Sequence, residues 1–337
     1  MADSVWFNFI LAAIPAGMPL LLGTLGEILT EKSGNINLGV EGMMYMGAIF
    51  GFLGGFYTNS AVFALLAAFG GGMLGALIYA FLTVTLKANQ NVTGLTLTIF
   101  GTGLASLIGE NLLAGGTASA SFSAELQASF GSIRIPLLAD IPYIGPLLFN
   151  NNIFVIIGVA CAIVMGLYLN HTRRGLNLRA VGENPGAADA AGVNVALYKY
   201  VHILIGGGIC GLGGGYVCFV TCKGLWVQNC VNGLGWIAVA LVIFASWSPY
   251  RAIFGSLVFG ALSVLQFYKP DFLRDVSAPI FSMLPFLVTA IVLVITSIRM
   301  SREKVQPKGC GTNYDREERY KTDDRCKSAL VVFSDCP

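Results

Sequence analysis

Long apolar runs alternate with short polar stretches along almost the whole chain. Nine runs of roughly 18 mostly apolar residues or more stand out, and a helix of that length crosses the hydrocarbon core of a bilayer. They cover residues 6–29, 36–57, 60–85, 92–113, 153–170, 200–221, 231–247, 251–268 and 278–298. The pattern predicts an all-α fold, a polytopic membrane bundle with about nine transmembrane helices.

Some of these runs contain residues that weaken regular helices. Pro15 and Pro19 lie in the first run, so we expect broken or re-entrant helices where protein shields the backbone. The strings GGGMLGALIYAFLT at 70–83 and GGGICGLGGGYVCFVT at 206–221 are similar, and glycines at four-residue spacing allow close helix packing. The two strings lie on runs predicted to cross in opposite directions, which hints at an inverted internal repeat, a common transporter plan.

Composition and charge refine this picture. Of 337 residues, 55% are hydrophobic and 11% are charged, whereas a soluble domain carries about 25% charged residues. With the C-terminal tail in the cytoplasm, seven further Lys and Arg residues fall inside and four outside, and the tail adds nine. Because cytoplasmic segments are enriched in Lys and Arg, we predict an external N-terminus, a cytoplasmic C-terminus and a large external segment at 114–152.

The chain divides into two parts. Residues 1–298 form the predicted transmembrane domain, and residues 299–337 form a polar tail with nine basic and seven acidic residues. Such a composition predicts a weakly ordered cytoplasmic extension, and a regulatory or partner-binding tail is the alternative. The eight cysteines include no CxxC pair and no His partner at zinc spacing, so we expect no metal site.

Several kinds of chemistry lack their motifs. No GxxxxGK[ST] string occurs, so we expect no ATP hydrolysis by this chain. No HExxH or GxSxG string provides the site of a membrane protease or lipase. We therefore expect a transport protein that is not an enzyme, with no cofactor on this chain and no nucleic acid partner.

The polar stretch at 171–199 separates two apolar runs. Glu183 or Asn184 lies where a helix would begin, Pro185 would occupy its first position, and Gly192 would end it after a run of alanines. A short surface helix with small side chains suits docking into a groove of another protein. A solvated connector explains the same residues, and the physical argument leaves both interpretations open.

At this loop the sequence resembles a known family. GAADAAG at 186–192 resembles the EAAxxxG motif of ABC importer permeases, with Gly186 in place of the motif's glutamate. RAVGENPGAADAAGVNV looks like the coupling loop of the branch that serves simple sugars and nucleosides. Further stretches at 26–52, 89–104, 138–149 and 233–262 resemble that branch, so the resemblance covers residues 5–298. The sequence is most similar to the second permease subunit of bacterial nucleoside importers, which is similar in turn to ribose-type permeases.

The resemblance implies a permease subunit that forms the pathway of an ATP-driven importer for nucleosides or related simple sugars in a bacterial cell membrane. Its implied partners are a cytoplasmic ATPase that binds ATP and magnesium, a second homologous permease, an extracellular substrate-binding lipoprotein and the surrounding membrane lipid. Carried over residue by residue, the ATPase contacts would be Glu183, Asn184, Pro185, Ala187, Ala188, Ala191 and Gly192.

Candidates for the solute pathway are polar or aromatic residues within the apolar runs, namely Asn37, Glu41, Asn91, Thr96 and Trp236. An ionisable residue inside a membrane is a functional candidate by default. A structural role is the alternative to solute contact for two of these residues. Glu41 would favour the positive end of its own helix, and Asn37 would cap that helix. Trp236 is the candidate for stacking on a base.

Two other classes of protein stay open. An ATPase-independent secondary transporter or channel for a small polar solute is the alternative, although few buried ionisable groups are available to couple it to an ion gradient. A membrane scaffold or enzyme is the third, and no catalytic motif favours it.

Overall fold

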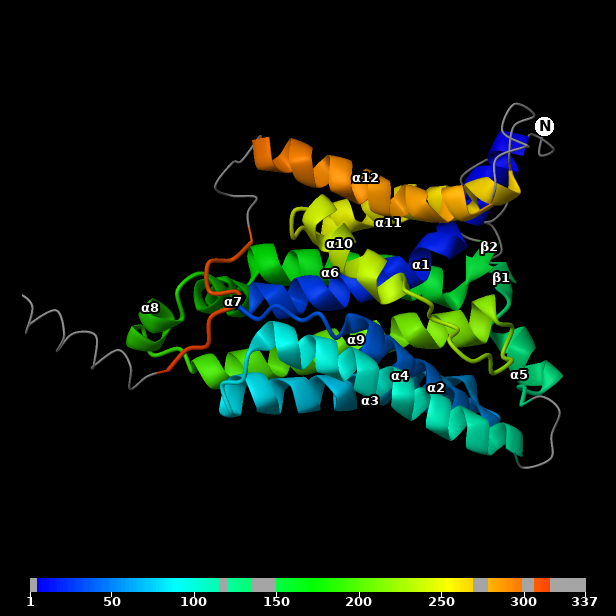
Figure 1. Cartoon of the computed structure of the whole chain (residues 1–337), viewed down its shortest axis with the longest axis horizontal. Helices are drawn as coiled ribbons and strands as arrows, with labels where there is room; N and C mark the ends of the chain where they lie inside the picture. The colour runs from blue at the N-terminus through cyan, green and yellow to red at the C-terminus, as the bar shows by residue number, and fades with distance from the viewer. Residues whose placement is uncertain (1–4, 115–119, 135–149, 269–277, 299–305, 316–337) are drawn as a thin grey trace, which may run out of the picture.

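A computed structural model describes residues 5–114, 120–134, 150–268, 278–298 and 306–315. This part of the protein is a bundle of helices that follow one long axis (Figure 1). The main helices are α1 (Val5–Lys32), α2 (Val40–Thr58), α3 (Ala61–Ala80), α4 (Gln90–Ala114), α6 (Ile153–His171), α9 (Val195–Tyr216), α10 (Leu234–Phe244), α11 (Pro249–Val264) and α12 (Ala278–Ile298). The shorter elements are the π-helical turns η1 (Phe81–Thr85) and η3 (Val217–Thr221), the 3₁₀ turn η4 (Leu265–Phe267), the helices α5 (Ala124–Ser129), α7 (Arg173–Glu183) and α8 (Pro185–Ala190), and the strands β1 (Ser132–Arg134) and β2 (Asn150–Asn152).

Each of the nine predicted spans overlaps one of the main helices, which confirms the all-α helical bundle. Five of the described helical segments are long and apolar enough to cross a membrane: Phe7–Lys32, Ala61–Thr85, Gln90–Leu112, Ile153–His171 and Val195–Thr221. The helices α10 and α11 are apolar but shorter. The predicted count of about nine transmembrane helices is therefore not confirmed.

Two prolines lie inside α1 without ending it. Pro19 has no N–H to offer the carbonyl of Pro15, four residues earlier. The hydroxyl of Tyr216 on α9 donates a hydrogen bond to that carbonyl at 2.7 Å, and the side-chain amide of Asn152 donates to the Tyr216 hydroxyl at 3.3 Å. A neighbouring helix thus satisfies the backbone group that the proline leaves unpaired, as an apolar environment requires.

The two similar glycine-rich segments pack against each other. A Cβ atom added to Gly72 of α3 would lie 2.2 Å from the carbonyl oxygen of Gly207, and one added to Gly211 of α9 would lie 2.4 Å from that of Ala68. A Cβ on Gly207 would meet Ala76 at 2.2 Å, so later residues of α3 meet earlier residues of α9 and the helices are antiparallel. Both continue into a π-helical turn. These features agree with opposite crossing directions, and the inverted repeat stays a prediction.

The two ends of the bundle differ. The start of α1, α5 and the antiparallel pair β1–β2 lie at one end, here called the α5 end, and α7 and α8 lie at the other, the α8 end (Figure 1). The described part of segment 114–152 thus lies opposite the loop at 171–199, as the predicted topology requires. Between the ends, buried side chains of α1, α2, α3, α6 and α9 form one continuous core.

A segment of the polar tail belongs to the folded body. Residues 306–315 pack at the α8 end, where the backbone N–H of Gly309 donates to the carbonyl of Gly182 at 2.8 Å. The rest of the predicted tail, at 299–305 and 316–337, lies outside the described residues. The expectation of weak order therefore does not describe residues 306–315, because their backbone groups find partners on the bundle.

Candidate docking helix and solute pathway

The predicted short helix is present as α8. The side-chain oxygen of Asn184 accepts a hydrogen bond from the N–H of Ala187 at 3.0 Å, and Pro185 occupies the first turn. Beyond the helix, Gly192 adopts a φ of +84°, the left-handed conformation that glycine adopts without strain. The cap, the proline and the terminating glycine all lie where the sequence predicted them.

The predicted docking residues do not all face the same way. Five of them are exposed, namely Glu183, Asn184, Ala187, Ala191 and Gly192, and Pro185 is half-buried. The side chain of Ala188 points into the body, where it is 4% exposed and packs with Val181 and Val195. Ala190, which the sequence argument did not select, is exposed beside Ala187 and Ala191, and its place on the same helical face was readable from the three-residue spacing.

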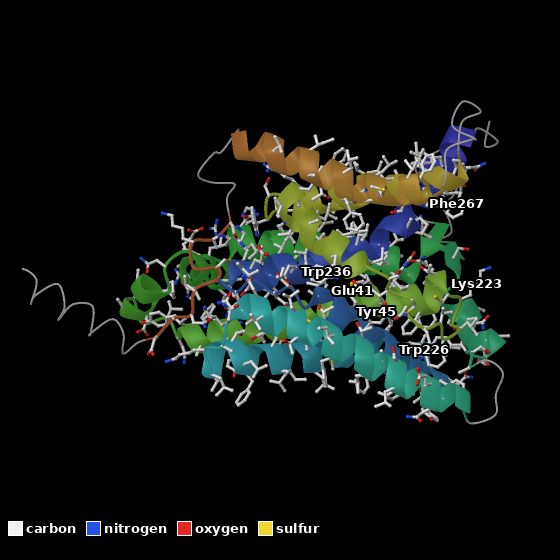
Figure 2. The ribbon with its side chains drawn as sticks, viewed as in Figure 1. Glu41, Tyr45, Lys223, Trp226, Trp236 and Phe267 are labelled. Carbon is white, nitrogen blue, oxygen red and sulfur yellow. The ribbon has the colours of Figure 1, made fainter. Side chains whose placement is uncertain are left out.

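Glu41 lies inside the bundle near Tyr45 and Trp236 (Figure 2). Its two carboxylate oxygens accept hydrogen bonds from the N–H groups of Gly233, at 2.7 Å, and Gly235, at 2.6 Å. These N–H groups belong to the start of α10, whose unpaired donors and partial positive charge attract an anion. The sequence predicts that Glu41 favours the start of its own helix α2, whereas its carboxylate caps the neighbouring helix α10.

The other pathway candidates fall into two groups. Asn37 is buried, and its side-chain oxygen accepts from the N–H of Gly39 at 2.9 Å in the turn before α2. Asn91 and Thr96 are exposed on α4, and Trp236 is 36% exposed on α10. Asn37 therefore stabilises the turn before α2. Asn91, Thr96 and Trp236 have exposed surface that a solute could contact.

Two buried glutamates on α1 were not predicted from the sequence. Glu27 and Glu31 lie one helical turn apart on α1 and are almost fully buried. Glu27 accepts from the N–H of Asn37 at 3.0 Å, and Glu31 accepts from the indole N–H of Trp247. The four-residue spacing of two glutamates in an apolar run was a usable signal, since it places both on one helix face.

A cavity of about 590 Å³ lies between α6 and α9. Its lining is mostly apolar and includes Met165, Val201 and Ile205, with Tyr168 and His202 joined by a 2.8 Å hydrogen bond at its wall. It contains none of the predicted pathway residues, so it does not mark the predicted pathway. Within the described residues, no cluster of three or more His, Cys, Asp or Glu side chains could hold a metal ion.

Comparison with known proteins adds independent information. Residues 9–294 match the family described as the permease component of the branched-chain amino acid transport system. The chain is 34% identical over 325 residues to TsgC13 of Haloferax volcanii, provisionally described as a glucose ABC transporter permease, covering 91% of this chain and 97% of that protein. It is 32% identical over 293 residues to the guanosine ABC transporter permease NupQ of Bacillus subtilis, covering 84% and 89%. It is 30% identical over 315 residues to the nucleoside ABC transporter permease NupC of Lactococcus lactis, covering 88% and 93%.

Proposed function

Because this chain belongs to the family of permease components of branched-chain amino acid transport systems, we propose that it forms the pathway of an ATP-driven importer for nucleosides or related simple sugars. The chain is a membrane permease subunit of an ABC transporter and is not itself an enzyme. Family membership implies an ATPase on another chain, which would bind ATP and magnesium. We further propose two partners, a second homologous permease and an extracellular lipoprotein. The chain would lie in the plasma membrane with its α8 end facing the cytoplasm.

One observation carries the coupling part of the proposal. The capped helix α8 projects at one end of the bundle (Figure 1) and exposes Ala187, Ala190 and Ala191 together. Small side chains let another protein's groove approach the helix backbone closely. ATP binding in the ATPase would move this helix and shift the permease between outward-open and inward-open states.

The solute part rests on relatives and on accessible surface. NupQ and NupC are permeases for guanosine and nucleosides, and the indole of Trp236, which is 36% exposed next to the Gly235 that Glu41 binds, offers an accessible aromatic face. A neutral nucleoside needs such a face for its base and polar groups for its ribose. We assign solute contact to Trp236, Thr96 and Asn91, and we assign Glu41 and Asn37 to holding the backbone around them.

The test of coupling uses the assembled transporter. We expect Ala191→Arg, and equally Ala187→Arg, to lower ATP-dependent nucleoside uptake about tenfold or more, because a bulky charge at a close-packed interface costs several kcal/mol. Ala191→Ser is the matched control and should transport normally. Membrane levels of each variant are measured by immunoblot. Normal uptake by the arginine variants would reject α8 as the docking helix, and uptake that persists without any ATPase would favour a secondary transporter or channel.

A further inference from the structure

Residues 306–315, here called the strap, contact several parts of the α8 end at once. On the docking side, the N–H of Gly309 donates to the carbonyl of Gly182 in α7 at 2.8 Å. The hydroxyl of Tyr314 donates to the carboxylate of Asp189 in α8 at 2.9 Å, and the Tyr314 ring packs with the cluster around Ala188. The strap therefore contacts both helices of the loop at 171–199, α7 and α8, and this loop is here called the docking loop.

On the other side, the strap is bound by Gln90 at the start of α4. The side-chain nitrogen of Gln90 donates to the carbonyl of Thr312 at 3.3 Å and to the side-chain oxygen of Asn313 at 3.1 Å. Its side-chain oxygen accepts from the N–H of Gly311 at 3.1 Å and from the N–H of Ile36 at 2.8 Å. Gln90 is 2% exposed, and a buried amide with all of its groups paired fixes the position of its partners.

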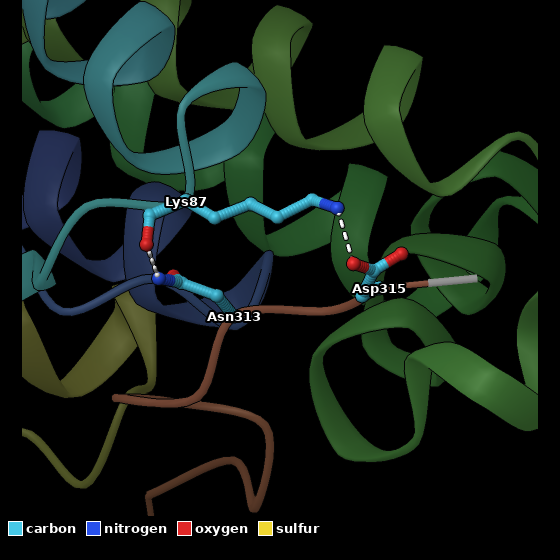
Figure 3. A network of polar contacts seen from close by, with 3 residues as sticks. All are labelled: Lys87, Asn313 and Asp315. Atoms are coloured by element: carbon cyan, nitrogen blue, oxygen red, sulfur yellow. Dashed lines mark hydrogen bonds and ion pairs between the residues drawn. The ribbon is translucent and has the colours of Figure 1, made fainter. Parts of the chain in front are cut away.

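Two further contacts complete the attachment. The side-chain nitrogen of Asn313 donates to the carbonyls of Lys87, at 2.6 Å, and Ala88, at 2.9 Å, and Asp315 pairs with the Lys87 ammonium at 2.5 Å (Figure 3). The thiol of Cys310 donates to the carbonyl of Glu31 in α1 at 3.2 Å. The strap thus reaches α1, the turn between η1 and α4, and the docking loop.

We propose that the strap is a positioning element that ties the docking helix to the α8 ends of α1 and α4, so that movement of α8 is passed to the pathway helices. This rests on the proposed function. The helix α8 has only six residues and buries one side chain, Ala188, against the body. So small a contact gives little resistance to independent movement, and coupling between sites needs a packed, continuous connection. The strap lies outside the matched family region, 9–294.

The position of the strap can be read independently of transport. Burial, and after it the Glu31 carboxylate, raise the pKa of the Cys310 thiol well above its ordinary value. Since the thiolate is the reactive form, Cys310 reacts slowly with N-ethylmaleimide at pH 8 while the strap is bound. Each unit by which the pKa returns toward normal raises the thiolate fraction about tenfold. Mass spectrometry of the Cys310 peptide therefore reports release of the strap.

The experiment compares variants of the full transporter in proteoliposomes. Gly309→Val combined with Asn313→Ala should release the strap, because a Cβ on Gly309 would lie 2.6 Å from the carbonyl oxygen of Gly182. Lys308→Ala is the matched control, since the Lys308 side chain is exposed and the contact of this residue with Glu183 is made by its backbone N–H. We expect Cys310 labelling to rise about tenfold in the double variant and solute moved per ATP hydrolysed to fall about fivefold or more, with ATP hydrolysis itself retained and the control unchanged.

Two results would overturn the proposal: an unchanged transport-to-hydrolysis ratio in a variant whose Cys310 is freely labelled, or a higher ratio, which would make the strap a brake. If Cys310 stays protected in the double variant, a chain ending at Val305 replaces it, and normal coupling by that chain rejects the proposal. Failure of the proposed function looks different, because wild-type protein would then show no ATP-dependent uptake and Ala191→Arg would have no effect.

Discussion

Glu41 combines a buried position with two short hydrogen bonds to the backbone at the start of α10. At the same site Gly233 has a φ of +86°, a conformation that turns the chain into the helix and that other residues rarely adopt. The hydroxyl of Tyr45 accepts from the N–H of Asn232 at 3.1 Å. Two side chains of α2, one helical turn apart, thus hold the segment that carries Trp236.

Removal of the Glu41 cap tests this assignment. We expect Glu41→Ala to destabilise the protein by about 2 kcal/mol, because the buried N–H of Gly235 and the half-buried N–H of Gly233 lose their acceptor. Glu41→Gln keeps one acceptor oxygen and should show a smaller loss. Thermal unfolding in detergent measures the effect, with Glu110→Ala on the exposed face of α4 as the control. Equal melting temperatures for the two alanine variants would show that the cap adds nothing to stability.

Substitution of Trp236 tests whether the transported solute carries a base that stacks on this ring. We expect Trp236→Ala to lower nucleoside uptake about tenfold, since stacking of a base on an aromatic ring is worth about 1–3 kcal/mol, and Trp236→Phe to retain most of the uptake. Uptake of radiolabelled nucleoside and of ribose is measured in the same proteoliposomes. Loss of both solutes alike would point to a structural role for the ring, and normal nucleoside uptake by the alanine variant would remove Trp236 from the pathway.

The sequence predicted the local geometry of α8 better than the contacts of Glu41 and Asn37, and the docking and pathway roles of these residues stay predictions. The cap at Asn184, the proline at 185 and the glycine at 192 act on neighbours in sequence, so local rules identify them. The partners of Glu41 and Asn37 depend on which helix packs beside α2, and no spacing rule contains that information. The inward orientation of Ala188 likewise depends on Val181 and Val195 across the loop.

At the scale of elements, apolar runs located the helices but not their true starts. The predicted span 36–57 begins as α2 only at Val40, because Asn37 is held in a turn by Glu27 and Gly39. The π-helical turns that follow α3 and α9 were not predicted, since a five-residue change of helix type leaves the apolar pattern unaltered. The strap was missed because its composition is polar and only its partners on the bundle give it order.

Glycine packing between α3 and α9 supplies a prediction at this scale. A Cβ on Gly211 would lie 2.4 Å from the carbonyl oxygen of Ala68, whereas a Cβ on Gly70 meets nothing within 4 Å. We therefore expect Gly211→Ala to destabilise the protein by about 1–3 kcal/mol through overpacking, and Gly70→Ala to be neutral or slightly stabilising. The fraction of monodisperse protein after heating in detergent compares them. Equal monodisperse fractions for the two variants would mean that α3 and α9 can move apart to admit the Gly211→Ala methyl group without loss of stability.

The whole molecule has an internal polarity that links the proposals. The docking helix, the strap and the turn at Lys87 share one end, while Lys223 lies at the other (Figure 2). Coupling to a cytoplasmic ATPase requires that the α8 end faces the cytoplasm. The excess of Lys and Arg in the loops assigned to this end and in the tail favours the same orientation. Charge distribution and coupling to the ATPase therefore require the same end of the molecule to be cytoplasmic.

Two exposed lysines at opposite ends test that claim. We expect a membrane-impermeant amine reagent to label Lys223 in intact protoplasts and to label Lys308 only after the membrane is opened, because the reagent cannot cross the bilayer. Mass spectrometry of the two peptides gives the extent of labelling, and opened protoplasts, in which both lysines react, are the control. Labelling of Lys308 in intact protoplasts would place α8 outside, where no ATPase reaches it, and would reject the coupling role of both α8 and the strap whatever the solute.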